Sequence, residues 1–240
     1  MSFTYAGSKE PALSHISFTA KPGETIGIIG GTGCGKSTLV NLIPRFYDVT
    51  SGNVVIDGNN VKEYPFSQLR KKVGMVPQQA VLFKGTIRDN MKWGKEDASE
   101  EEIQRALSIA QASDFVKSKP EGLNTMVSQG GANLSGGQRQ RLTIARALVG
   151  DPEILIMDDS ASALDFATDA ALRHAIHEQT KGMTVFIVSQ RATSIKQADK
   201  ILVLDDGKLA GVGTHKELME SCEVYREICL SQLSEQEVNR

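Results

Sequence analysis

The sequence predicts an α/β domain, and two observations support that prediction. Short apolar runs of strand length, such as residues 25–29 and 154–157, alternate with longer segments of helical spacing. A glycine-rich loop, Gly30-Gly31-Thr32-Gly33-Cys34-Gly35-Lys36-Ser37, stands between the first of these runs and a helical segment. Strands that alternate with helices are typical of a mostly parallel sheet covered by helices.

Composition narrows the class of protein. The chain has 240 residues, of which 40% are hydrophobic, which fits one large domain or one domain with a helical insert. A net charge of −2 gives no sign of the basic stripe that nucleic-acid binding usually requires. No apolar run approaches the ~20 residues of a membrane-spanning helix. We therefore expect any membrane association to come through a partner or through polypeptide outside this chain.

The N-terminal third predicts β structure and one helix. Residues 2–5 alternate between polar and aromatic side chains, like a strand whose first residues are missing, which suggests an excised domain. Residues 13–29 alternate around a turn at 21–24, which predicts a hairpin. A helix is expected from about 36 to 46. Further strands are expected at 53–58 and 73–77.

The stretch from about 86 to 119 has helical spacing and polar faces, which indicates a helical subdomain inserted into the α/β core. We expect that subdomain to cover roughly residues 86–150 and the core to cover roughly 1–85 and 151–240 of a single domain, 1–240. The elements expected beyond residue 119 are helices at 135–149 and 166–179, strands at 154–158, 184–189 and 201–204, a hairpin around 205–207 and a helical tail from 214.

The glycine-rich loop matches G-x-x-x-x-G-K-S, a phosphate-binding pattern. Its glycines let backbone N–H groups converge on phosphate oxygens, and the helix dipole adds positive potential. Lys36 supplies a charge to the β- and γ-phosphates, and Ser37 is a ligand for Mg²⁺. The residues expected around the nucleotide here are Gly30, Gly31, Thr32, Gly33, Cys34, Gly35, Lys36, Ser37 and Thr38.

Asp158 ends an apolar strand, so we expect its carboxylate at the carboxyl edge of the sheet, where ligands bind in open α/β folds. It is the second candidate ligand for Mg²⁺. Cys34 has two interpretations. A helix N-terminus lowers a thiol pKa and could make it reactive, but a small loop residue whose backbone matters is the simpler interpretation.

The run Leu134-Ser135-Gly136-Gly137-Gln138-Arg139-Gln140-Arg141 resembles the signature motif of ATP-binding cassette (ABC) proteins. The resemblance covers nearly the whole chain and keeps the family's order of motifs. Residues 81–83 and 14–18 are similar to the exporter branch. The motifs, in order, are Tyr5, the phosphate loop, Gln78, the signature, Asp158 and Ser162-Ala163-Leu164-Asp165.

The resemblance implies an ABC ATPase fold, with a RecA-like P-loop core, an N-terminal antiparallel β-subdomain and an inserted α-helical subdomain. It implies ATP and Mg²⁺ as cofactors and ATPase activity coupled to transport. It also implies two partners: a transmembrane domain, which this chain lacks, and a second nucleotide-binding domain stacked head to tail. The expected location is the cytoplasmic face of a cell membrane.

The resemblance also assigns roles to residues. Tyr5 would stack on adenine, and Gln78 would touch Mg²⁺ or its water. Asp165 and Ser162 would lie at the dimer interface. The residues that would contact the γ-phosphate bound to the other subunit are Ser135, Gly136, Gly137 and Gln138.

Two positions depart from the family's active pattern. Asp159 stands where a Glu polarises the attacking water, and it is shorter by one methylene, about 1.5 Å. Gln190 stands where a His acts as the switch residue. With Lys36, these are the candidate catalytic residues. The segment 125–131, before the signature, also lacks the acidic and basic residues expected of an exporter.

Intact binding motifs beside two altered catalytic positions resemble the degenerate subunit of bacterial heterodimeric multidrug exporters. On that interpretation the chain's own site hydrolyses ATP slowly, while its signature serves an unlike partner. One alternative is a homodimeric exporter domain in which Asp159 works as the base. Another is deliberate replacement of Glu and His to trap ATP.

Two other classes of protein carry similar cassettes. Cassettes of DNA repair insert a long coiled coil between phosphate loop and signature, but only about a hundred residues separate them here, without sustained heptads. Soluble regulatory or translation-linked cassettes usually carry two cassettes in one chain, and this chain has one.

Overall fold

The computed structural model describes residues 1–160, 163–180 and 182–232. The chain divides into two compact units. Unit 1 comprises Met1–Val73 and Thr184–Arg240, and unit 2 comprises Gly74–Met183. Both units combine strands with helices, so the predicted α/β class is confirmed.

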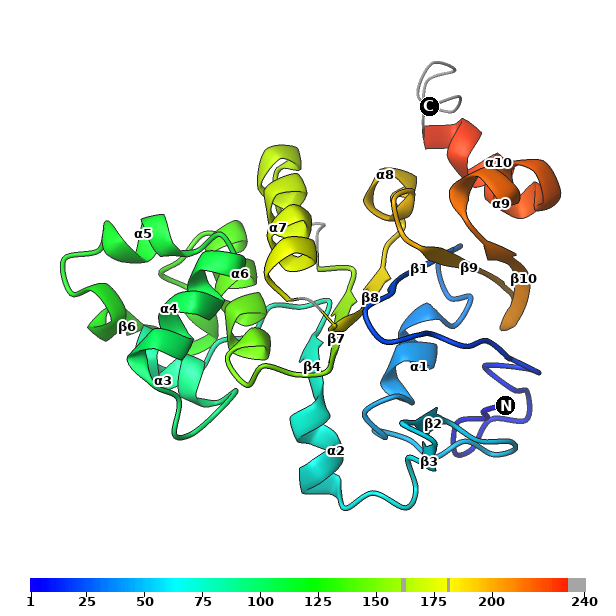
Figure 1. The fold of residues 1–240 in the computed structure, drawn as a ribbon, viewed down its shortest axis with the longest axis horizontal. Helices are drawn as coiled ribbons and strands as arrows, with labels where there is room; N and C mark the ends of the chain where they lie inside the picture. The colour runs from blue at the N-terminus through cyan, green and yellow to red at the C-terminus, as the bar shows by residue number, and fades with distance from the viewer. Residues whose placement is uncertain (161–162, 181, 233–240) are drawn as a thin grey trace. The chain divides into compact units, whose positions relative to one another are not determined.

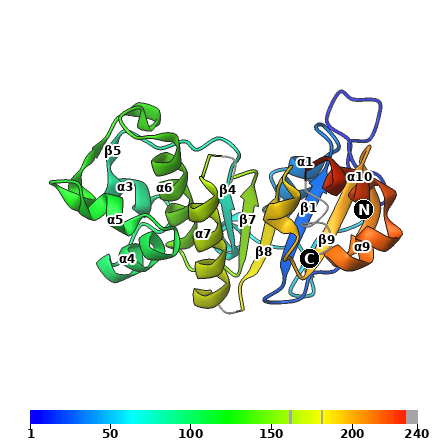
Figure 2. The ribbon, with the colours of Figure 1, turned by 90° about the horizontal axis from the view of Figure 1, so that it is seen from above.

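Strand β1 is the centre of the sheet in unit 1. It is parallel to β8 on one edge and to β9 on the other, and β10 returns antiparallel to β9. Figure 2 shows β8, β1 and β9 side by side. The three isoleucines of β1 are fully buried, which matches its apolar run. The strands are β1 (Thr25–Gly30), β8 (Thr184–Val188), β9 (Lys200–Asp205) and β10 (Lys208–Gly213).

Helices cover this sheet at close range. A Cβ added to Gly27 would lie 2.7 Å from the Ile195 Cβ, so α8 approaches β1 through a glycine. Helix α10 packs on β1, β9 and α8 (Figure 1). It buries Tyr225 and Cys229. The helices of unit 1 are α1 (Lys36–Asn41), α2 (Phe66–Lys72), α8 (Ala192–Ile195), α9 (His215–Ser221) and α10 (Glu223–Gln232).

The hairpin predicted over residues 13–29 is wrong, because both edges of β1 are occupied by β8 and β9. The turn itself exists, since the Glu24 N–H donates to the Lys21 carbonyl at 3.1 Å. The strand expected at 2–5 is reduced to single bridges from Ser2 and Phe3. The helix expected at 36–46 ends at Asn41. A short hairpin does form between β2 (Val55–Ile56) and β3 (Asn59–Asn60).

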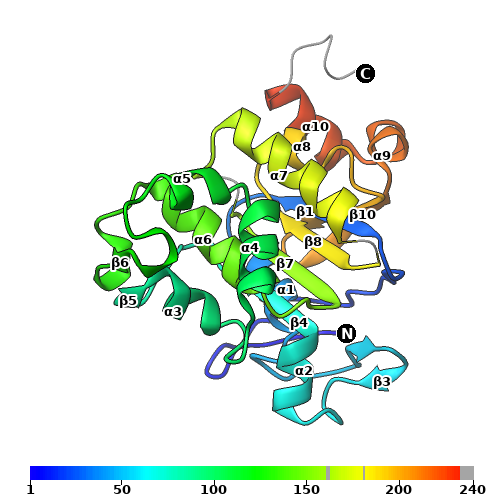
Figure 3. The same ribbon diagram turned by 60° about the vertical axis from the view of Figure 1, so that its left-hand side comes forward.

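Unit 2 is mostly helical. Strands β4 and β7 are neighbours, and β5 pairs antiparallel with β6. Helix α4 packs against α6 and α7 (Figure 3). The elements are β4 (Val73–Val76), β5 (Gly85–Thr86), β6 (Met126–Val127), β7 (Ile154–Asp158), α3 (Ile87–Lys92), α4 (Glu100–Ile109), α5 (Ser113–Lys117), α6 (Gly136–Leu148), α7 (Phe166–Gln179) and 3₁₀ turns Gly122–Asn124 and Gln129–Gly131.

Side-chain caps define where several helices begin. Capping boxes open α3 at Thr86, α4 at Ser99 and α9 at Thr214, each with an acidic residue three positions later. Such boxes satisfy N–H groups that the first helical turn leaves without partners. None of the helices in the described ranges has the length and apolar character needed to cross a bilayer.

Candidate nucleotide site

The phosphate loop leaves the carboxyl end of β1 in a conformation that requires glycine at two positions. A Cβ at Gly30 would lie 2.1 Å from the Leu204 carbonyl oxygen and 2.7 Å from the Cys34 Sγ. Gly35 has a φ of +100°, and a Cβ there would lie 2.7 Å from the Leu13 Cδ2. The loop is therefore fitted against β9 and the N-terminal segment, and larger residues would displace it.

Lys36 lies inside this loop and is almost fully buried. Its ammonium donates to the carbonyl oxygens of Gly30 (2.8 Å) and Gly31 (2.7 Å) and reaches the Cys34 Sγ at 3.7 Å. An ammonium has three donors and no acceptor. The loop thus holds one concentrated positive charge in its centre, where an anion can approach.

Helix α1 begins at Lys36 without a side-chain cap, because Gly35 occupies the capping position. The start of a helix carries N–H groups and partial positive charge. A phosphate can therefore take the place that a capping side chain takes in other helices. The loop, the uncapped helix and Lys36 together fit a phosphate group.

Tyr5 lies beside α1. Its hydroxyl is 2.9 Å from the Thr38 Oγ1, and its side chain remains partly exposed. Its ring meets those of Phe3 and Tyr47 edge-on, at centroid distances of 4.8 and 5.3 Å. Tyr47 is also exposed. Sequence reasoning missed Tyr47, because its approach to Tyr5 depends on tertiary contacts.

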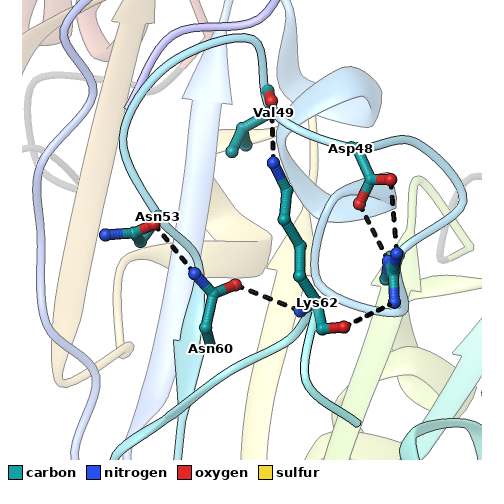
Figure 4. A network of polar contacts seen from close by, with 6 residues as sticks. Asp48, Val49, Asn53, Asn60 and Lys62 are labelled. Carbon is teal, nitrogen blue, oxygen red and sulfur yellow. Dashed lines mark hydrogen bonds and ion pairs between the residues drawn. The ribbon is translucent and has the colours of Figure 1, made fainter. Parts of the chain in front are cut away.

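A polar network holds the segment that carries Tyr47 (Figure 4). The Arg45 Nε donates to the Asp48 Oδ1 at 2.8 Å, and this bond lowers the pKa of the Asp48 carboxyl. The Lys62 Nζ donates to the Val49 carbonyl at 3.3 Å. The network thus links residues on both sides of Tyr47 to one another and to Lys62.

Gln190 follows β8 in unit 1, two residues beyond the pairing of Val188 with Ile28 of β1. It is exposed, whereas the preceding Ser189 is buried. Because β1 and β8 are parallel, Gln190 and the phosphate loop lie at the same carboxyl edge of the sheet. The structure therefore places Tyr5 beside the helix that follows the phosphate loop, and Gln190 at the same edge of the sheet as that loop.

Asp158 and Asp159 occupy the end of β7 in unit 2. Asp158 is buried, and Asp159 is half-buried with a left-handed φ of +46°. The Gln78 Nε2 donates to the Asp159 Oδ2 at 3.4 Å, although 81 positions separate the two residues. Carboxylate and amide oxygens are suitable ligands for Mg²⁺.

The signature opens helix α6 with a capping box. The Ser135 Oγ accepts from the Gln138 N–H at 3.2 Å, and the Gln138 Oε1 accepts from the Ser135 N–H at 3.1 Å. Among the described residues, a Cβ at Gly136 would meet only the Arg139 side chain, at 3.9 Å, and one at Gly137 would meet nothing closer than 3.5 Å. Packing against the described part of the chain does not require these glycines, and they leave the helix start accessible.

Asp165 is the cap of helix α7. Its carboxylate accepts from the Thr168 N–H at 3.0 Å and from the Thr168 hydroxyl at 2.7 Å. The backbone bond from Thr168 is the main cause that lowers the pKa of the Asp165 carboxyl. Ser162, the other residue predicted at a dimer interface, lies outside the described residues.

Unit 1 thus carries the phosphate loop with Ser37 and Thr38, Tyr5 and Gln190, and unit 2 carries Gln78, the two acids after β7, the signature and Asp165. Within the described ranges, no three His, Cys, Asp or Glu side chains group into a metal site. A Mg²⁺ site would therefore depend on a few protein oxygens together with phosphate and water, as is usual for that ion.

Comparisons with known proteins agree with this arrangement. A family model described as ABC transporter matches residues 13–162. The chain is 47% identical over 233 residues to an uncharacterized ABC transporter ATP-binding protein of Mycobacterium bovis, covering 96% of this chain and 40% of that protein. It is 44% identical over 236 residues to an ATP-dependent lipid A-core flippase of Vibrio vulnificus, covering 98% of this chain and 40% of that protein.

A solved structure of a bacterial Atm1-family ABC exporter with ATP bound superimposes with a TM-score of 0.92 at 37% sequence identity. That similarity covers 98% of this chain and 41% of the exporter. The chain therefore spans about 40% of the length of the curated relatives it matches.

Alkylation of Cys34 is expected to block nucleotide binding, and Mg-ATP is expected to protect it. The reason is that the Cys34 Sγ lies within the phosphate loop, beside Lys36. Mass spectrometry of each cysteine after a timed pulse of N-ethylmaleimide measures this. All three cysteines are buried, so the readout is the change that ATP causes in the labelling of Cys34, with Cys222 and Cys229 as internal controls. Equal labelling of Cys34 with and without ATP would contradict the prediction.

Asp165→Asn is expected to reduce the acid sensitivity of folding. The native pKa of Asp165 lies below that of the unfolded chain, about 3.9. Its charge therefore stabilises the fold above that pH, and this contribution is lost as pH falls through the native pKa. The difference in unfolding free energy between wild type and Asp165→Asn should shrink from pH 5 to pH 2.5 in urea titrations. A constant difference would contradict this assignment.

Proposed function

This chain belongs to the ABC transporter family, and on that premise we propose that it is the nucleotide-binding domain of an exporter. It binds Mg-ATP, stacks head to tail on a second such domain and couples ATP binding and hydrolysis to efflux of a substrate across a membrane. A transmembrane domain, on the same or an associated polypeptide, is its other partner. The domain works at the cytoplasmic face of that membrane.

The observation that carries this proposal is the fit of the phosphate loop to an anion. Gly30 and Gly35 shape the loop, Lys36 concentrates charge within it, and α1 begins without a side-chain cap. Such a loop at the carboxyl edge of a parallel sheet is suited to a nucleoside triphosphate. Exporter function is supported by similarity to the lipid A-core flippase and to the Atm1-family exporter.

The proposed roles follow from chemistry and placement. Lys36 neutralises the β- and γ-phosphates, and Tyr5 stacks on the adenine with its ring held by Phe3 and Tyr47. Ser37, Gln78 and Asp158 would hold Mg²⁺, which would neutralise negative charge on the transferring phosphoryl group. The residues of the loop and helix start proposed to line the phosphates are Gly30, Gly31, Thr32, Gly33, Cys34, Gly35, Ser37 and Thr38.

We propose that the chain's own site hydrolyses ATP slowly. Asp159 has the charge of a general base but a shorter reach than Glu, and its carboxylate is engaged by Gln78. A misplacement near 1 Å can cost on the order of 10²-fold in rate. Gln190 can donate to the γ-phosphate but lacks the imidazole of the family's switch residue.

The signature supports a partner of a different kind. Ser135 caps α6, and Gly136 and Gly137 leave that helix start accessible, so an anion held by another subunit can reach it. Gln138 completes the cap. A chain with a slow site and an intact signature is best matched by an unlike subunit whose own Glu and His hydrolyse ATP. Ser162 and Asp165 would lie at that interface.

The alternative is a homodimeric exporter domain in which Asp159 is a competent base. The contact between Gln78 and Asp159 favours neither arrangement by itself. Steady ATP hydrolysis by the chain alone, with a rate that rises with the square of its concentration, would favour the homodimer.

Lys36→Ala is expected to abolish Mg-ATP binding, because it removes the only ammonium seated in the described part of the phosphate loop. Isothermal titration with Mg-ATP measures this, and Lys71→Ala, on the exposed face of α2, is the matched control. Unchanged binding by Lys36→Ala would refute nucleotide binding at this loop.

Asp159→Glu combined with Gln190→His is expected to raise ATP turnover in the assembled transporter by at least ~10-fold, since a positioned acid–base group contributes roughly 10²–10⁴-fold. Phosphate release at saturating ATP measures the rate. Each single variant shows how the gain divides, and thermal unfolding controls for strain, because residue 159 has a positive φ. An unchanged rate of phosphate release would contradict the proposal that the chain's own site is slow.

A further inference from the structure

The turn between β8 and α8 has backbone groups that its own residues do not satisfy. Strand β8 ends at Val188 and α8 begins at Ala192. Arg191, at the capping position, makes no side-chain cap bond. The first N–H of α8 and the carbonyl of Gln190 therefore need partners from elsewhere.

Gln232, the last residue of α10, supplies both partners. Its Oε1 accepts from the Ala192 N–H at 2.9 Å, and its Nε2 donates to the Gln190 carbonyl oxygen at 2.8 Å. A primary amide has one acceptor and one donor side by side, which matches the exposed backbone pair. A side chain about 40 positions away in the sequence thus bonds both backbone groups of the turn.

Helix α10 presents Gln232 from an anchored face. Tyr225, Cys229 and Gln232 follow the spacing i, i+4, i+7, which places them on one side of the helix. Tyr225 and Cys229 are fully buried, and the Tyr225 hydroxyl lies 2.9 Å from the His215 Nδ1. The amide of Gln232 is therefore carried by a packed element and not by a free tail.

The turn is also fixed from within. The Ser189 Oγ accepts from the Arg191 N–H at 2.9 Å, and the Ser189 N–H donates to the Ile28 carbonyl of β1 at 3.1 Å. The backbone of Gln190 is therefore held on one side by the bonds of Ser189 and on the other by the two bonds from Gln232. The side chain of Gln190 stays exposed.

We propose that Gln232 is a positioning residue that holds Gln190 in the conformation that meets the γ-phosphate, an inference that rests on the proposed nucleotide site. Two backbone bonds restrict the turn before ligand arrives, so less ordering is needed when Gln190 makes its contact. Helix α10 thereby raises the affinity of the site for the γ-phosphate of ATP. The affinity for ADP, which lacks that phosphate, should not depend on Gln232.

The test measures Mg-ATP and Mg-ADP dissociation constants for the whole chain and its variants. Gln232→Ala should weaken Mg-ATP roughly fivefold, the effect of about one hydrogen bond, and leave Mg-ADP unchanged. Gln232→Glu keeps the acceptor for Ala192 but sets a carboxylate against the Gln190 carbonyl, so it should weaken Mg-ATP at least as much. Leu230→Ala, at an exposed position of α10, is the control and should change neither constant.

Two further measurements separate positioning from a general structural effect. In a Gln190→Ala background, Gln232→Ala should have no further effect on the ATP-to-ADP ratio. Hydrogen exchange at the Ala192 amide should quicken in Gln232→Ala and not in Leu230→Ala. Any one of three results would overturn the inference alone. They are an unchanged ratio of the Mg-ATP and Mg-ADP dissociation constants in Gln232→Ala, an equal loss of Mg-ATP affinity from Gln232→Ala in the Gln190→Ala background, and unchanged hydrogen exchange at the Ala192 amide. Failure of the wild-type chain to bind Mg-ATP would overturn the nucleotide site and this inference together.

Discussion

The position of β1 between two parallel partners is the constraint on which the nucleotide site depends. Both edges of β1 are bonded, to β8 and to β9, so its carboxyl end has no freedom to shift. Gly30 then passes so close to the Leu204 carbonyl that no side chain fits. The loop turns there and places the Lys36 ammonium against the carbonyls of Gly30 and Gly31. The sheet, more than the loop itself, sets where phosphate can bind.

The capping position at the start of a helix has different uses in this protein. Several helices close their first turn with a capping side chain, as α9 does with Thr214. Helix α1 has Gly35 in that place, which leaves its start to a ligand. Helix α6 keeps a cap in Ser135, whose oxygen accepts an N–H while its own O–H remains able to donate outward. The cap that stabilises α6 thus leaves Ser135 able to donate to an anion, as proposed for the signature.

Two of the candidate catalytic residues share a structural setting. Asp159 follows β7 and Gln190 follows β8, and each is contacted by a residue from a distant part of the sequence. Gln78 reaches the first and Gln232 reaches the second. The proposed slow site rests on these two positions, whereas the phosphate loop is built from other residues, 30–37.

Features that arise from local pattern could be predicted from the sequence. The helix at 166–179 and the strand that ends at Asp158 lie where predicted, and the helix expected at 135–149 is found at Gly136–Leu148, because apolar spacing acts over a few positions. Tertiary contacts were needed to show which strands flank β1, that Tyr47 lies against Tyr5 and that Gln232 bonds to the turn of Gln190. Each of these pairings joins segments far apart along the chain, and spacing in a sequence carries no information about such partners.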